Sequence, residues 1–159
     1  MRAEHPGPLS PPLPRIGIDI PDGWTVKPHA NALIAAFDPD SPVLGRTTVY
    51  VTAGRLVGDT SLDEVVAKGH STLRQRYPDS ELELTKHGKA GGHEARFSVI
   101  TVKAAEFPTP LFQTETSILV PSATPGVSHV VQLLCECSAT RAKEMSPVFS
   151  AILRSLSID

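Results

Sequence analysis

The two cysteines are the first residues to consider for chemistry, because Cys135 and Cys137 have the spacing of a redox or metal-binding pair. In a strand, side chains two residues apart point to the same face, and the extended backbone between them disfavours a disulfide. The sequence offers no second Cys or His pair at ligand spacing from them. We therefore expect two reduced cysteines in an apolar core, with a redox or metal pair as the alternative.

Histidines are the other candidate metal ligands, and one pair is suggestive. His87 and His93 flank the glycine-rich stretch 88–92, so a hairpin there would let them approach each other. A metal ion would need a further ligand, and Glu94 would point to the face opposite His93. The sequence thus favours two solvated histidines and predicts no metal site.

Two more histidines stand in regular patterns. His129 lies among apolar residues, so we expect a hydrogen-bonded interior side chain and no catalytic base, whereas His70 flanks a helical stripe and should be half exposed. The chain has no G-x-S-x-G nucleophile elbow, and the glycines of 54–58 and 88–92 match neither a dinucleotide-binding nor a P-loop pattern. We expect a protein that is not an enzyme and binds no cofactor.

Composition sets the class of protein. The 159 residues are 40% hydrophobic and 20% charged, which predicts one globular domain with a sizeable core. A net charge of −2 gives no electrostatic footprint for nucleic acid, and no apolar run is long enough to span a membrane. Five prolines make residues 1–14 a proline-rich flexible arm ahead of a single domain over 15–159. No signal peptide is visible, so we expect a cytoplasmic protein if Met1 is the true start.

The first half of the domain reads as strands followed by a helix. Strand-like runs cover 16–20, 32–37 and 47–51, and the short turns between them favour a meander. A helix over 61–77 follows, with a capping box from Ser61 to Glu64 and Pro78 after its end. Gly69 falls on the apolar stripe of this helix, which suggests a close approach of helix and sheet.

The second half adds four strands and a closing helix. Strands are expected over 81–86, 95–102, 111–120 and 127–138. The last strand has one apolar face and one mixed face, and the mixed face suggests only partial cover by a helix. We expect a short turn up to Met145 and then the main helix, capped by Ser146 with Pro147 at its first position.

The order β-β-β-α-β-β-β-β-α and four short motifs resemble the PsbP-like superfamily. The motifs are Ile18–Trp24 with its Pro-Asp-Gly-Trp turn, the helix over 61–77, Gly92–Ala95, and the closing run Phe149–Leu156. The group includes the PsbP subunit of photosystem II, the Ran-release factors and actinobacterial proteins of the LpqN/LpqT type, to which the pattern is most similar. The resemblance implies an α+β fold, an α-β-α sandwich with a mostly antiparallel sheet. It also implies a role in binding, with no shared catalytic residues. The chain lacks the lipobox cysteine, so a lipid anchor does not carry over.

A loop rich in proline and phenylalanine is the candidate partner-binding surface. Phe107, Leu111 and Phe112 stand around two prolines, as suits a stiff apolar anchor, although the two rings would serve equally as core. We predict a non-enzymatic domain that binds a protein partner or forms a homodimer. The alternative is a carrier of a small molecule or lipid, with an apolar pocket between sheet and helix. A pocket of roughly several hundred Å³ would favour the carrier, and a flat apolar patch the partner-binding domain.

Overall fold

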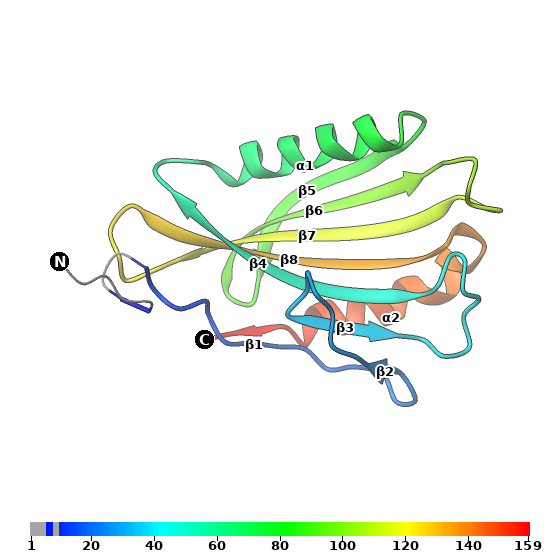
Figure 1. Ribbon diagram of the computed structural model, residues 1–159, viewed down its shortest axis with the longest axis horizontal. Helices are drawn as coiled ribbons and strands as arrows, with labels where there is room; N and C mark the ends of the chain where they lie inside the picture. Colours follow the sequence, from blue (N-terminus) through cyan, green and yellow to red (C-terminus); the bar gives the residue numbers. More distant parts are fainter. Residues whose placement is uncertain (1–5, 8–9) are drawn as a thin grey trace.

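The computed structural model describes residues 6–7 and 10–159, and these form an α-β-α sandwich (Figure 1). In this part of the chain seven strands make one antiparallel sheet in the order β2-β3-β4-β8-β7-β6-β5. The strands are β2 Thr25–Val26, β3 Ile34–Phe37, β4 Thr48–Val57, β5 Glu81–Ala90, β6 His93–Val102, β7 Leu111–Pro121 and β8 Val127–Ser138. Helix α1 (Leu62–Arg76) lies on one face and helix α2 (Ala142–Arg154) on the other, so the predicted fold class is confirmed.

The opening strands pair differently from the predicted meander. Only Ile16–Gly17 of the run 16–20 is a strand, β1, and it pairs with β9 (Ser157–Ile158) in a separate two-stranded sheet. The outer place of the meander goes to β2, which pairs with β3. The physical reason is that the Asp19 amide donates to the side-chain hydroxyl of Ser155, at 2.8 Å, and so is not available to a backbone carbonyl of a neighbouring strand.

The predicted arm has some described contacts. The carbonyl of Pro11 accepts a hydrogen bond from Arg55 of β4, at 2.9 Å. Gly7 and Ser10 exchange two backbone hydrogen bonds. The prediction of flexibility for 1–5 and 8–9 lies outside the described residues.

Helix α1 begins and ends as the sequence predicts. The amide of Glu64 donates to the Ser61 hydroxyl at 3.2 Å, and the Ser61 amide donates to the Glu64 carboxylate at 2.7 Å, so the capping box is confirmed. The amide of Tyr77 closes the last turn by donating to the carbonyl of Leu73. The pKa of the Glu64 carboxyl is lowered by its hydrogen bonds with Ser61.

The main core lies between the sheet and α2. Met145, Phe149 and Ile152 of α2 are buried against the apolar side chains of β4, β7 and β8. Cys135 and Cys137 belong to this core as buried free thiols, as predicted. Burial raises the pKa of Cys135 to about 12 and that of Cys137 to about 11, so both are poor nucleophiles near neutral pH.

Helix α2 starts earlier than expected. A short 3-10 turn, Ala139–Arg141, leads directly into the helix, and Pro147 lies inside it instead of at its first position. Pro147 has no amide hydrogen, and it therefore cannot donate to the carbonyl one turn before it. Burial of Met145 in the turn before Pro147 helps to stabilise the longer helix. None of the helices in the described ranges combines the length and apolar composition that crossing a bilayer requires.

Candidate functional site

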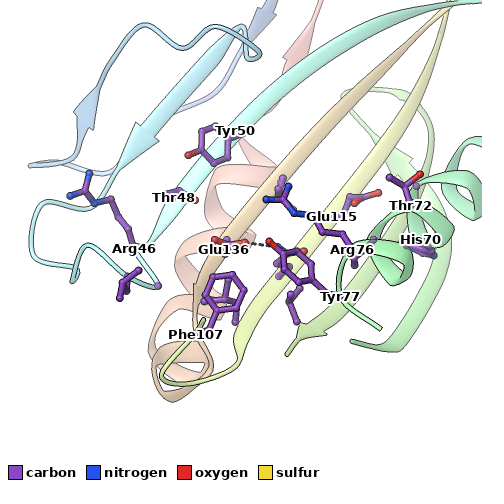
Figure 2. A pocket seen from close by; sticks show the side chains of 18 of the residues that line it. Arg46, Thr48, Tyr50, His70, Thr72, Arg76, Tyr77, Phe107, Glu115 and Glu136 are labelled. Atoms are coloured by element: carbon purple, nitrogen blue, oxygen red, sulfur yellow. Dashed lines mark hydrogen bonds between the residues drawn. The ribbon is translucent and has the colours of Figure 1, made fainter. Parts of the chain in front are cut away.

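Helix α1 covers only part of its face of the sheet. It packs on β6 and β7, while the β4–β8 side of the same face stays open (Figure 1). A pocket of about 680 Å³ lies there, between α1, the sheet and the β3–β4 loop, residues 38–47 (Figure 2). We call this pocket the groove. The mixed second face predicted for β8 is its floor, with Leu134 and Glu136 directed into it.

Gly69 of α1 lines the groove, and its position corrects an expectation. A side chain added at Gly69 would meet no atom within 4 Å, so the helix does not approach the sheet closely there. Leu62 and Val66, nearer the start of α1, are buried against the sheet. At Gly69, by contrast, the missing side chain leaves open space. The small residue therefore widens the groove instead of tightening the packing.

One end of the groove is apolar. Val102 at the end of β6 and Leu111 at the start of β7 are buried, and Leu73, Tyr77 and Phe107 pack against them. The rings of Tyr77 and Phe107 are 5.7 Å apart between centroids and stand together in Figure 2. This contact anchors the end of α1 to the loop before β7 and gives the groove an apolar wall.

The other end of α1 is held by an ion pair. The guanidinium of Arg96 on β6 is only 8% exposed and donates to Asp63 of α1 at 2.7 Å, with Glu94 at 2.9 Å. The hydrogen bond from Arg96 lowers the pKa of the Asp63 carboxyl. With both ends fixed in this way, the middle of α1 forms one wall of the groove.

The floor carries polar groups in two rows. Register places Thr48, Glu136 and Gln113 side by side, and Tyr50, Leu134 and Glu115 form the next row. Gln113 donates a hydrogen bond to the Glu136 carboxylate. Burial raises the pKa of both Glu136 and Glu115.

A side pocket continues the groove past Tyr50. It has a volume of about 270 Å³ and shares Tyr50, Glu115 and Leu134 with the groove. His29 closes it on one side, with its ring 5.1 Å from that of Tyr50. Burial, and after it the charge of Glu136, raises the pKa of the Tyr50 phenol. This phenol is therefore a neutral donor at the junction of the two spaces.

Two arginines stand on opposite walls of the groove. Arg46 of the β3–β4 loop lies over the ring of Phe37 at 5.9 Å, and Arg76 of α1 lies over the ring of Tyr77 at 5.2 Å. Neither forms an ion pair with a described residue. The loop that carries Arg46 also exposes apolar surface, since Val43 is 80% and Leu44 61% exposed.

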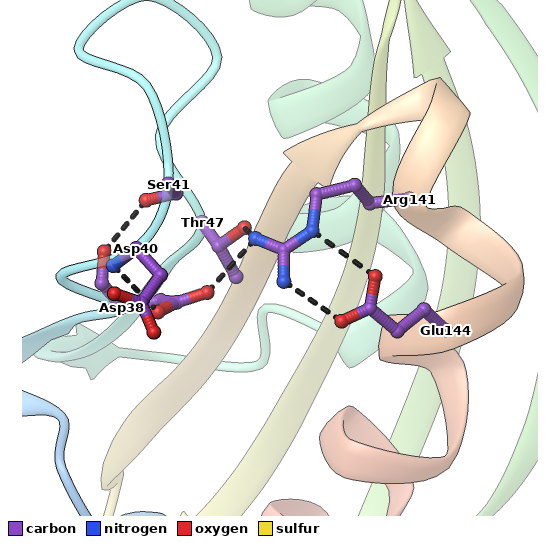
Figure 3. A network of polar contacts seen from close by, with 6 residues as sticks. All are labelled: Asp38, Asp40, Ser41, Thr47, Arg141 and Glu144. Atoms are coloured by element: carbon purple, nitrogen blue, oxygen red, sulfur yellow. Dashed lines mark hydrogen bonds and ion pairs between the residues drawn. The ribbon is translucent and has the colours of Figure 1, made fainter.

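A polar network fixes the base of the β3–β4 loop (Figure 3). Arg141 donates to Asp38 at 2.8 Å and to Thr47 at 2.9 Å, and it pairs with Glu144 of α2 at 2.9 Å. Ser41 donates to the carbonyl of Asp38 at 2.7 Å. The pKa of Arg141 is raised by these hydrogen bonds, first of all that with Glu144, so it stays charged. The loop is thus tied to α2 at both of its ends, while its tip reaches the groove.

Comparison with known proteins identifies the fold. No family model matches the chain, and no curated protein does so. Among solved structures, LpqN of Mycobacterium tuberculosis, a protein involved in cell envelope biogenesis, matches with a TM-score of 0.74 at 18% identity, over 97% of this chain and 87% of that one. The chain has a PsbP-like fold, related to that of LpqN.

Two further structures agree. Cyanobacterial PsbP from Synechocystis matches with a TM-score of 0.64 at 10% identity, over 100% of this chain and 98% of that one. A protein of unknown function from Pseudomonas aeruginosa, PA94, a putative regulator, matches with 0.56 at 14% identity, over 91% and 96%. At these identities the likeness concerns the PsbP-like fold and leaves the ligand to be argued from the groove.

The predicted partner-binding residues do not share one face of the PsbP-like fold. Phe107 and Leu111 line the groove, although Leu111 is only 4% exposed. Phe112 points to the opposite face and packs against the main core. That they bind a protein partner stays a prediction.

The two histidines of the β5–β6 hairpin lie apart from each other. His87 pairs in register with Arg96 and His93 with Ala90, so the two do not meet across the hairpin. Within the described residues no group of three or more His, Cys, Asp or Glu is placed to hold a metal ion. His129 is buried as expected, but its Nε2 finds no hydrogen-bond partner among those residues, and burial lowers its pKa.

Sequence reasoning did not select the polar residues of the groove. His70 is half exposed, as expected, but its Nε2 is buried on the groove wall without a hydrogen-bond partner among the described residues. Arg46, Arg76 and Glu115 carry no motif, and a loop, a helix and a strand far apart in the sequence bring them to one site. The mixed face of β8 was the one available signal.

Proposed function

We propose that this PsbP-like protein is a binding domain that holds an amphipathic small molecule in the groove, without chemical turnover. The observation that carries the proposal is the open β4–β8 half of the sheet face beside the middle of α1. Its volume of about 680 Å³ lies within the range of small-molecule sites. Apolar residues line one end and polar side chains converge at the other, which suits a ligand with two unlike ends.

The groove favours the carrier over the protein-binding alternative. A partner-binding surface was expected to be a flat apolar patch at Phe107, Leu111 and Phe112. In the structure Leu111 is buried and the two phenylalanines point to opposite faces, so these residues do not supply such a patch together. The hollow beside Phe107 offers concave apolar surface instead.

Binding of N-phenylnaphthylamine, an uncharged probe that fluoresces in apolar surroundings, tests the proposal. The probe should bind the wild-type protein with saturation. Gly69→Leu should abolish binding, because the new side chain enters open space in the groove. Ala67→Leu is the matched control, since Ala67 is exposed on α1 and does not line the groove.

The outcomes separate cleanly. Loss of binding in Gly69→Leu with retention in Ala67→Leu supports the groove as the site. Equal binding by all three proteins, or no saturable binding by the wild type, contradicts it. Thermal unfolding of each variant checks that loss of binding does not reflect loss of fold.

A further inference from the structure

We propose that the ligand of the groove is an anionic amphiphile, whose carboxylate or phosphate head lies between Arg46 and Arg76 and whose hydrocarbon tail lies along the apolar end. This inference rests on the proposed function and adds the charge of the ligand to it. The two arginines come from opposite walls, one from the β3–β4 loop and one from α1 (Figure 2). A head group between them would bridge the groove.

Neither arginine has a carboxylate partner among residues 6–7 and 10–159. Several other cations of the fold are paired: Arg96 with Asp63, Lys103 with Glu81 and Arg141 with Asp38. No ion pair with a described residue occupies Arg46 or Arg76. Both guanidinium groups therefore keep their donors available for an anion.

Each guanidinium group is held over an aromatic ring. The guanidinium carbon lies 5.9 Å from the ring centroid of Phe37 for Arg46 and 5.2 Å from that of Tyr77 for Arg76. Such a cation–π contact uses none of the N–H donors, and the planar fork matches carboxylate and phosphate oxygens. A weakly hydrated cation beside apolar surface suits a charged head attached to a tail.

The acidic residues of the floor, Glu115 and Glu136, would attract a cationic head if both were fully charged and free. Glu136 already accepts a hydrogen bond from Gln113, and Ser117 donates to Glu115 at 3.4 Å. Burial favours the neutral form of both carboxyls, which weakens their repulsion of an anion above them. The two floor carboxyls therefore oppose an anion less than two fully hydrated carboxylates would.

The tail has a continuous apolar path. Leu73, Tyr77 and Phe107 form one wall and Val43 and Leu44 stand on the opposite lip. The two lip residues are strongly exposed in the free protein, and a tail between the walls would cover them. This accounts for two large apolar side chains beside the entrance.

Displacement of N-phenylnaphthylamine by amphiphiles with one tail and different heads tests the inference. Dodecyl phosphate and dodecanoate should displace the probe at lower concentrations than the neutral dodecyl maltoside or the cationic dodecyltrimethylammonium, all below their micelle concentrations. The double change Arg46→Gln, Arg76→Gln should weaken dodecyl phosphate binding by about tenfold or more and leave dodecyl maltoside unchanged. Arg74→Gln is the matched control, because Arg74 is on α1 outside the groove.

The two proposals fail in different ways. If the neutral or cationic head competes as well as the anionic ones, or if the double change leaves the preference intact, the anionic ligand is refuted while the groove stands. If the probe itself does not bind the wild type, both proposals fail. The inference is supported if the protein prefers an anionic head, if raised salt weakens this preference and if the double change removes it.

Discussion

Replacing Gly69 by alanine should stabilise the protein, although a glycine at a helix–sheet contact usually resists substitution. The added methyl group would meet no atom within 4 Å, so no clash offsets the helical propensity of alanine. Gly69 lies in the middle of α1, where the change from glycine to alanine contributes about 1 kcal/mol to the free energy of unfolding. For a domain of this size that corresponds to a rise in Tm of about 2–4 °C.

The assay is thermal unfolding followed by circular dichroism, with urea unfolding as a second measurement. Ala67→Gly on the exposed side of the same helix is the matched control and should lower stability by about 1 kcal/mol. A fall in Tm for Gly69→Ala would refute the reasoning, since it would mean that α1 packs on the sheet at this position. The same result would also mean that the open space at Gly69, on which the groove depends, does not exist.

Three further predictions concern other parts of the fold. The folded protein keeps a proton on Glu115 at pH values where the unfolded chain, with a pKa near 4.5, has lost it, so this residue reduces stability as pH rises toward its folded pKa. The free energy of unfolding of Glu115→Gln, relative to that of the wild type, should therefore be higher at about pH 8 than at about pH 4. The gain is about 1.4 kcal/mol for each pH unit by which folding raises the pKa, and thermal unfolding at both pH values measures it. An equal difference between the two proteins at both pH values would contradict this. Cys135 and Cys137 should resist a disulfide thiol reagent at neutral pH until the protein unfolds, because both are buried with raised pKa; rapid labelling of the folded protein would contradict the core placement. Arg141→Met should cost about 1–3 kcal/mol in urea unfolding because buried Asp38 loses its cation, and a change under about 0.5 kcal/mol would show that the network does not stabilise the loop.

Local patterns predicted the local elements well. The helix over 61–77 follows from the Ser61–Glu64 capping box and from Pro78, and both act within one turn of the helix end. The alternation in β8 likewise predicted the buried thiols, because a period of two separates the faces of any strand.

Features that depend on distant residues were not predictable in this way. The pairing of β1 with β9 joins segments at opposite ends of the domain, and nothing in either segment specifies the other. Pro147 inside α2 is tolerated because tertiary contacts of Met145 outweigh a local rule. The groove is the strongest case, since Gly69 indicates either close packing or open space, and only the placement of α1 on β6 and β7 decides between them.

The place of β8 in the sheet has a consequence for the kinetics of folding. Strands β5 to β8 pair with their neighbours in sequence, whereas the seam between β4 and β8 joins residues far apart in the chain, such as Thr48 and Glu136. We expect the β5–β8 meander to assemble first and the seam to close late, because its long loop must be ordered before the contacts form. The walls of the groove come from both sides of this seam, so the groove exists only once the seam has closed. A bound ligand should therefore slow unfolding and leave the rate of refolding nearly unchanged.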